Sequence, residues 1–167
     1  MAVVLSRIDD RLIHGQILEV WVPFLNVDCI VVANDEVASM TLRQTIMRAA
    51  IPKGTRVFFE KVAGLGELFS RPELRERRVL MLFAGSGDAL KAFRLGVGFS
   101  EVNLGNLHAD GDADRVSCTV WLYPEDIDNL NALEKEGVKV VSQCVPSDRR
   151  QSWKELIGER GRKDVPG

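Results

Sequence analysis

The 167-residue chain is long enough for one domain with a sizeable core and short for two. Its 22 Lys+Arg and 24 Asp+Glu give a formal net charge of -2, which argues against a nucleic-acid partner. The apolar runs fall far short of the roughly 20 residues that cross a bilayer, and "MAVVLSRIDD" has no basic leader, so we expect a cytoplasmic protein.

Short β-branched runs alternate with segments of helical spacing along the chain. Strands are predicted over residues 2–5, 28–33, 56–60, 78–83, 99–104, 116–122 and 137–144. Helices are predicted after Gly15 and over residues 36–50, 63–70, 87–95, 124–136 and 148–157. This alternation favours a single-domain α/β fold: an open, mostly parallel twisted sheet of about seven strands with helices on both faces.

Three segments carry further expectations. In 36–50 the apolar spacing predicts one buried face, made by Val37, Met40, Thr41, Ile46, Met47 and Ala50. The segment "GNLHADGDAD", 105–114, joins two strand patterns without a helix, which favours a hairpin-like return and one antiparallel edge strand. We expect the domain to cover residues 1–157 and the remaining tail, 158–167, to be frayed.

The cysteines show no spacing typical of a metal site. Cys29, Cys118 and Cys144 lie far apart, each inside an apolar run, and no CxxC or Cys/His pair is present. We interpret each as a small buried hydrophobe and expect no metal and no cofactor.

The stretch "SRIDDRLIHGQ", residues 6–16, concentrates charge directly after the first strand pattern. His14 lies where a helix begins, and free N–H groups at such a position favour an anion. Arg7 and Arg11 offer guanidinium groups suited to phosphate, and Asp9 or Asp10 can orient the imidazole and leave its other nitrogen free. This pattern fits phosphohistidine chemistry, but a capping histidine beside a solvated salt-bridge network fits the same residues.

The motifs "RIDDRLIHGQ" and "IVVANDEVA", followed by "RVLMLF", "EVNLG" and "VWLYPEDIDNLNALEKEGVKV", cover nearly the whole chain. Together they closely resemble the enzyme IIB component of the mannose/fructose/sorbose class of the bacterial sugar phosphotransferase system. The resemblance implies that His14 takes a phosphoryl group from the phosphohistidine of a IIA domain. It would then pass the group to a sugar at the membrane IIC/IID complex, so that the protein works at the inner face of the membrane through its partners.

The same resemblance assigns residues to the phosphate site. Arg7, Asp9, Asp10, Arg11 and Gln16 would line it, and Gly15 would leave room for a partner histidine. Asp9 and Asp10 are the candidates for orienting the imidazole. In "FAGSGD", Ser86 is the candidate for a hydroxyl that holds the phosphoryl group, with a plain turn or helix-cap serine as the alternative. We also expect His14 to be exposed, at least transiently, because two proteins must bring their histidines together.

One stretch departs from the family pattern. The family commonly has paired glycines, approximately "NVGGM", where this chain has "NLGNLHADGD" with Asn106 in place of the second glycine. This departure puts partner contacts and sugar specificity in doubt more than phosphotransfer itself. His108, close behind, fits a second phosphate-facing group, a metal ligand or an exposed loop residue.

Other functions stay open on the sequence alone. The same domain could switch partners by its phosphorylation state and regulate without transferring a sugar. It could also be an unrelated small-molecule-binding α/β protein whose arginine pair holds an anion. The sequence does not decide whether the chain forms a homo-oligomer or which sugar it serves.

Overall fold

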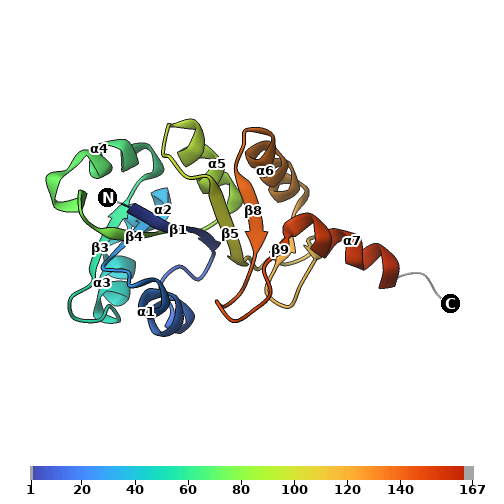
Figure 1. Cartoon of the computed structure of the whole chain (residues 1–167), viewed down its shortest axis with the longest axis horizontal. Helices are drawn as coiled ribbons and strands as arrows, with labels where there is room; N and C mark the ends of the chain where they lie inside the picture. Colours follow the sequence, from blue (N-terminus) through green and yellow to red (C-terminus); the bar gives the residue numbers. More distant parts are fainter. Residues whose placement is uncertain (1, 164–167) are drawn as a thin grey trace.

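The computed structural model describes residues 2–163 and shows one twisted sheet with helices on both faces (Figure 1). In this part of the chain the sheet has seven strands in the order β3-β2-β4-β1-β5-β8-β9. Their bounds are Ala2–Asp9 (β1), Cys29–Ala33 (β2), Arg56–Glu60 (β3), Arg78–Phe83 (β4), Glu101–Asn106 (β5), Lys139–Ser142 (β8) and Gln151–Ser152 (β9). All neighbours are parallel except β8 and β9, which confirms the predicted open α/β class.

Two hydrophobic cores lie on opposite faces of the sheet. Helices η1 (Gln16–Trp21), α1 (Val22–Leu25), α2 (Asp35–Ser39) and α3 (Thr41–Ala49) pack on one core. The other core takes η2 (Val62–Gly64), α4 (Leu65–Ser70), η3 (Pro72–Leu74), α5 (Ser86–Arg94), α6 (Pro124–Lys135) and the start of α7 (Trp153–Lys163). The central strands explain this division: every residue of β2 is buried, and so are the last five of β4, as strands covered on both sides require.

The antiparallel edge strand does not follow the 105–114 segment, where the sequence predicted it. Residues 114–115 (β6) and 121–122 (β7) pair with each other in a separate two-stranded sheet, so the strand predicted over 116–122 does not join the main sheet. The edge strand is β9 instead, inside the segment predicted as the helix 148–157. Its two residues pair with the free edge of β8 before α7 begins at Trp153.

The helix predicted over 36–50 is two helices with a break at Met40, whose φ and ψ of -110° and 87° are not helical. The side-chain amide of Gln44 donates to the backbone carbonyls of Val37 and Ala38. These bonds satisfy carbonyl groups at the end of α2 that a continuous helix would otherwise bond. The prediction of one buried apolar face is therefore wrong in part. Val37 is buried, but Met40 is 44% and Ile46 is 65% exposed.

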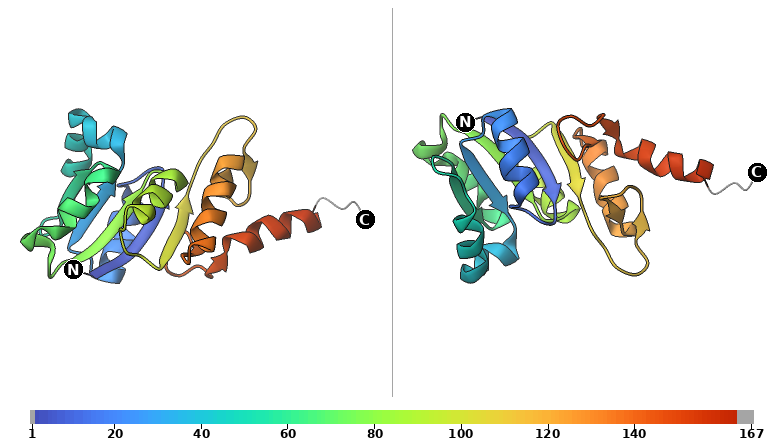
Figure 2. Two further views of the ribbon diagram at one scale, coloured as in Figure 1. Left: turned by 90° about the horizontal axis from the view of Figure 1, so that it is seen from above. Right: turned by 90° about the horizontal axis from the view of Figure 1, so that it is seen from below.

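The last helix extends beyond the predicted domain end at 157. Helix α7 runs through Lys163 and projects away from the sheet (Figure 2), while residues 164–167 of the predicted frayed tail lie outside the described residues.

Within residues 2–163, no helix combines the length and the apolar character that crossing a bilayer requires.

Two leucines provide a matched test of where the core lies. Leu80 on β4 is fully buried, whereas Leu42 on α3 is 73% exposed. We expect Leu80→Ala to lower the free energy of unfolding by about 2–5 kcal/mol, because the truncation leaves a cavity. We expect Leu42→Ala to change it by about 0.5 kcal/mol or less. Urea unfolding measures both, and equal losses would contradict the described packing.

Candidate functional site

The candidate site forms at the carboxyl end of β1, where the chain turns sharply into η1. The amide of Leu12 donates to the carbonyl of Asp9 over 2.9 Å, which closes the turn. Leu12 takes a left-handed conformation with φ of 56°, which costs a non-glycine residue about 1–2 kcal/mol. Its side chain is fully buried, and this burial offsets the strain. The turn brings His14 back beside the end of β1.

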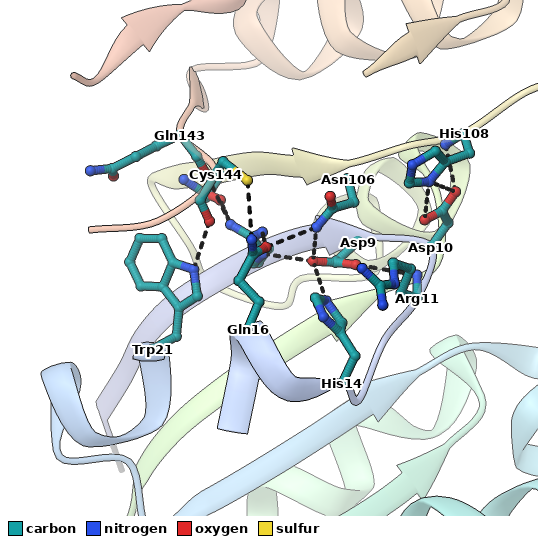
Figure 3. A network of polar contacts seen from close by, with 12 residues as sticks. Asp9, Asp10, Arg11, His14, Gln16, Trp21, Asn106, His108, Gln143 and Cys144 are labelled. Atoms are coloured by element: carbon teal, nitrogen blue, oxygen red, sulfur yellow. Dashed lines mark hydrogen bonds and ion pairs between the residues drawn. The ribbon is translucent and has the colours of Figure 1, made fainter. Parts of the chain in front are cut away.

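The carboxylate of Asp9 is the centre of the site (Figure 3). It is fully buried, and its Oδ2 contacts three nitrogens: His14 Nε2 at 3.0 Å, Arg7 Nε at 3.0 Å and Asn106 Nδ2 at 2.8 Å. Its Oδ1 accepts from the backbone N–H of Arg11 at 3.2 Å. Asp9 thus contacts the imidazole directly, as the orienting role requires.

Asp9 is ionised in this environment. Burial by itself raises its pKa, but the hydrogen bond with His14, the charge of Arg7 and the hydrogen bond from Asn106 together hold the pKa below its ordinary value. An ionised carboxylate only accepts hydrogen bonds. The proton in the bond between Asp9 and His14 therefore belongs to Nε2 of the imidazole.

Arg7 was predicted to bind phosphate, but its guanidinium is fully buried and already occupied. Nη1 donates to Asn103 Oδ1 at 2.5 Å and to the carbonyl of Gln143 at 2.9 Å, and Nη2 donates to Gln16 Oε1 at 3.3 Å. The group also lies over the ring of Trp21, 5.3 Å from its centroid. In this conformation Arg7 is an internal counter-ion and not a phosphate ligand, since burial leaves no face of it to an incoming anion.

Gln16 likewise points inward instead of lining an open phosphate site. Its Oε1 accepts from Asn106 Nδ2 at 3.1 Å as well as from Arg7, and its Nε2 donates to Cys144 Sγ at 3.2 Å. The indole of Trp21 donates to the carbonyl of Cys144 at 3.0 Å. These bonds tie η1 to the segment that follows β8.

The cysteines differ from one another more than the sequence suggested. Cys144 is half-buried and accepts a hydrogen bond, and Cys118 is exposed, so the interpretation as a buried hydrophobe holds only for Cys29. Burial raises the pKa of the Cys29 thiol to about 11.

Among the described residues, no cluster of three His, Cys, Asp or Glu side chains is arranged to hold a metal ion.

His14 lies just before the N-cap of η1, Gly15, as predicted, and its carbonyl accepts from the N–H groups of Ile17 and Leu18. Its side chain is only 7% exposed, so the imidazole is more covered than we expected. Within residues 2–163, its Nδ1 has no hydrogen-bond partner, whereas Nε2 is held by Asp9. The ring is therefore held at Nε2, and Nδ1 is left without a hydrogen bond among the described residues.

Arg11 and Gly15 stay candidates for contacts with phosphate or a partner. Arg11 is exposed, and no side chain in the described part of the protein pairs with its guanidinium. Gly15 is also exposed, and a Cβ added there would meet only the Glu19 carboxylate, at 3.8 Å. No contact among the described residues requires a glycine at this position, and the room for a partner histidine stays a prediction.

Asp10 faces away from His14 and holds the other histidine of the chain. Its Oδ2 accepts from the backbone N–H of His108 at 2.5 Å, and both oxygens lie 3.1 Å from His108 Nδ1. His108 is 48% exposed and lies against the ring of Trp121, with centroids 5.3 Å apart. Asp10 thus orients the segment after β5 and not the His14 imidazole.

Ser86 also differs from its predicted role. It is buried, and its hydroxyl donates to Asp126 Oδ1 at 2.6 Å and accepts from Asn129 Nδ2 at 3.0 Å. These contacts tie the start of α5 to α6. In this conformation the hydroxyl is not free for a phosphoryl group, and it makes no cap hydrogen bond to its own helix either.

Two site residues lie inside a strand and had no predicted role, although the segment "NLGN", 103–106, lies at the end of the sheet where a site is expected. Asn103 and Gly105 belong to β5, which is a neighbour of β1 in the sheet. A Cβ on Gly105 would lie 2.0 Å from the Cζ of Arg7, so the guanidinium packs directly on the strand backbone. A glycine inside the strand pattern "EVNLGN" is the signal that predicts such a close approach of another group to the backbone.

The fold and the site define a class of protein: an α/β domain that presents a carboxylate-oriented histidine at the carboxyl ends of its central strands. Comparison with known proteins identifies the family. The model of the "PTS system sorbose subfamily IIB component" matches residues 3–165. The chain belongs to this family of phosphotransferase-system components.

Individual relatives agree over nearly the full chain. The sorbose-specific EIIB component of Klebsiella pneumoniae is 34% identical over 159 residues, covering 95% of this chain and 97% of that protein. The fructose-specific EIIB component of Bacillus subtilis is 28% identical and covers 94% and 96%. The crystal structure of the IIBSor domain of the K. pneumoniae sorbose permease has a TM-score of 0.89 at 33% identity, with 95% and 98% coverage.

The contact between Gly105 and Arg7 gives a stability test. We expect Gly105→Ala to destabilise the protein by about 3 kcal/mol or more, because the added methyl displaces the guanidinium from its buried partner. Gly66→Ala in α4 is the matched control: a Cβ there meets nothing within 4 Å, and alanine should stabilise the helix by about 0.5–1 kcal/mol. Thermal unfolding measures both, and losses of the same sign and size would refute the close approach.

The lowered pKa of Asp9 gives a pH test. Because its folded pKa lies below the unfolded value of about 3.9, its contribution to stability is complete above that pH. The contribution is lost as the pH falls through the folded pKa. We therefore expect the free energy of unfolding of the wild type to fall more steeply below pH ~4 than that of Asp9→Asn. Urea unfolding across this range measures the slopes, and parallel slopes would show that Asp9 is not stabilised as a carboxylate.

Proposed function

We propose that this IIB component carries the phosphoryl group on Nδ1 of His14. In this proposal the group comes from the phosphohistidine of a IIA domain and goes to a sugar at the membrane IIC/IID complex. The single observation that carries the proposal is the 3.0 Å contact between His14 Nε2 and Asp9 Oδ2. A carboxylate that holds the proton on Nε2 leaves the lone pair of Nδ1 free to attack phosphorus.

The transfer step balances without any further reactant. The phosphorus–nitrogen bond of the donor histidine breaks, and a bond from phosphorus to His14 Nδ1 forms. The Nε2 proton stays on the ring, and the negative charge of Asp9 stabilises the positive charge that the ring gains. Passing the group to a sugar hydroxyl reverses the bond change at Nδ1, and the hydroxyl proton is released.

The two arginines of the motif have different roles in this proposal. Arg7 keeps Asp9 ionised and in place from within the core. Arg11, which is exposed, is the guanidinium that can follow the phosphoryl oxygens and neutralise their charge. Because the phosphorus–nitrogen bond is already activated, positioning and charge neutralisation are the contributions that the protein must make.

A relative supports the choice of donor. The mannose-specific EIIAB component of Escherichia coli is 31% identical over 159 residues, which cover 95% of this chain but 49% of that protein. Its name joins a IIA part to a IIB part in one chain. We therefore propose a IIA domain as the partner that docks beside His14.

Labelling from phosphoenolpyruvate, through the upstream phosphotransferase proteins and a IIA domain, tests this function. The chain has two histidines, so the outcome is decisive. We expect the wild type and His108→Gln to incorporate phosphate and His14→Gln to incorporate none. Label that persists in His14→Gln and disappears in His108→Gln would overturn the assignment.

Asp9→Asn tests the orienting contact in the same assay. An asparagine can offer its N–H₂ group to Nε2 and so favour the tautomer whose Nδ1 carries the proton. We expect initial labelling to slow by about 100-fold or more, by analogy with other carboxylate-oriented histidines. A change of less than about threefold would show that Asp9 does not select the tautomer.

A further inference from the structure

We propose that Asn106 sets how firmly His14 holds its phosphoryl group, by sharing the Asp9 oxygen that orients the imidazole. Asn106 is a positioning residue in this inference, because it acts on His14 only through Asp9. The inference rests on the proposed function of His14.

The geometry places the two donors on one atom. Asn106 is buried at the end of β5, and its Nδ2 lies 2.8 Å from Asp9 Oδ2, the same oxygen that lies 3.0 Å from His14 Nε2. The other hydrogen bond of this amide, to Gln16 Oε1 at 3.1 Å, fixes its direction (Figure 3). The side chain therefore competes with the imidazole for the same lone pairs.

Competition of this kind changes the basicity of the carboxylate. Each donor on Oδ2 withdraws negative charge from the oxygen, and a carboxylate with more donors is a weaker base. A weaker base pulls less on the Nε2 proton, so it gives less electron density to the ring. The ring then holds phosphorus less firmly at Nδ1 and releases it more readily to the next acceptor.

Asn106 can be removed without breaking the rest of the network. Without its amide, Asp9 keeps Arg7 Nε, and Gln16 Oε1 keeps the Nη2 of Arg7. The ion pair that anchors the site stays complete. The expected effect of Asn106→Ala is thus a more basic Asp9 and a more stable phosphohistidine.

The test measures the phosphoryl equilibrium between this chain and a IIA domain, with the IIA part of the E. coli mannose-specific EIIAB component as the probe. We expect Asn106→Ala and Asn106→Gly to shift the equilibrium toward the phosphorylated chain by about three- to tenfold. A second arm needs no partner: the chain is phosphorylated with phosphoramidate, and the variants should hydrolyse more slowly by a similar factor.

Asn34→Ala is the control. Asn34 caps α2 and accepts from the N–H of Val37 at 2.9 Å, so its loss lowers stability without touching the Asp9 network. We expect this variant to keep the wild-type equilibrium and hydrolysis rate. A merely structural role of Asn106 would lower the melting temperature, as in Asn34→Ala, and leave the equilibrium and the hydrolysis rate unchanged.

The outcomes separate the two proposals. If His14 of the wild type takes phosphate and the Asn106 variants show an unchanged or opposite equilibrium and hydrolysis rate, the inference about Asn106 is overturned and the proposed function stands. If His14 takes no phosphate from either donor, the proposed function fails and the inference fails with it.

Discussion

A buried negative charge organises this end of the molecule. The carboxylate of Asp9 has no exposure to water, and an isolated charge in such a place is unfavourable by several kcal/mol. It is stable because four donors surround it, and one of them, Arg7, is a buried cation. The imidazole of His14 is one of the four, so the position and protonation of the candidate reactive group follow from the way the core neutralises Asp9.

The need to neutralise the buried Asp9 explains why residues of the same type in the motif have different roles. Arg7 and Arg11 are both in the motif, but only Arg7 is within the core, where Gly105 lets it reach the backbone of β5. Asp9 and Asp10 are adjacent, yet they point to different histidines. The buried member of each pair builds the site, whereas Arg11 is exposed and Asp10 binds His108 in the segment after β5. A site held in this way is preorganised, because breaking a buried ion pair is strongly unfavourable.

The fold class could be predicted from the sequence because buried parallel strands such as "VLMLF" have a pattern that few other structures share. The position of His14 just before a helix also followed from one motif, but the motif left open whether Asp9 or Asp10 contacts the imidazole. The contacts of each guanidinium and hydroxyl could not be predicted, since they depend on segments distant in sequence: Arg7 on β1 with Gln143 after β8, and Ser86 in α5 with Asp126 in α6. The edge strand was missed for a related reason, because two residues of β9 are too few to show a strand pattern.

Asp9 fixes the tautomer of His14 only if the ring proton lies on Nε2. Nitrogen-15 NMR of the imidazole at neutral pH locates this proton, because protonated and unprotonated ring nitrogens have well-separated chemical shifts. We expect Nε2 of His14 to carry the proton, Nδ1 to carry none, and Asp9→Asn to reverse or mix the two tautomers. A neutral wild-type ring with its proton on Nδ1 would show that Asp9 does not orient His14 for attack through Nδ1.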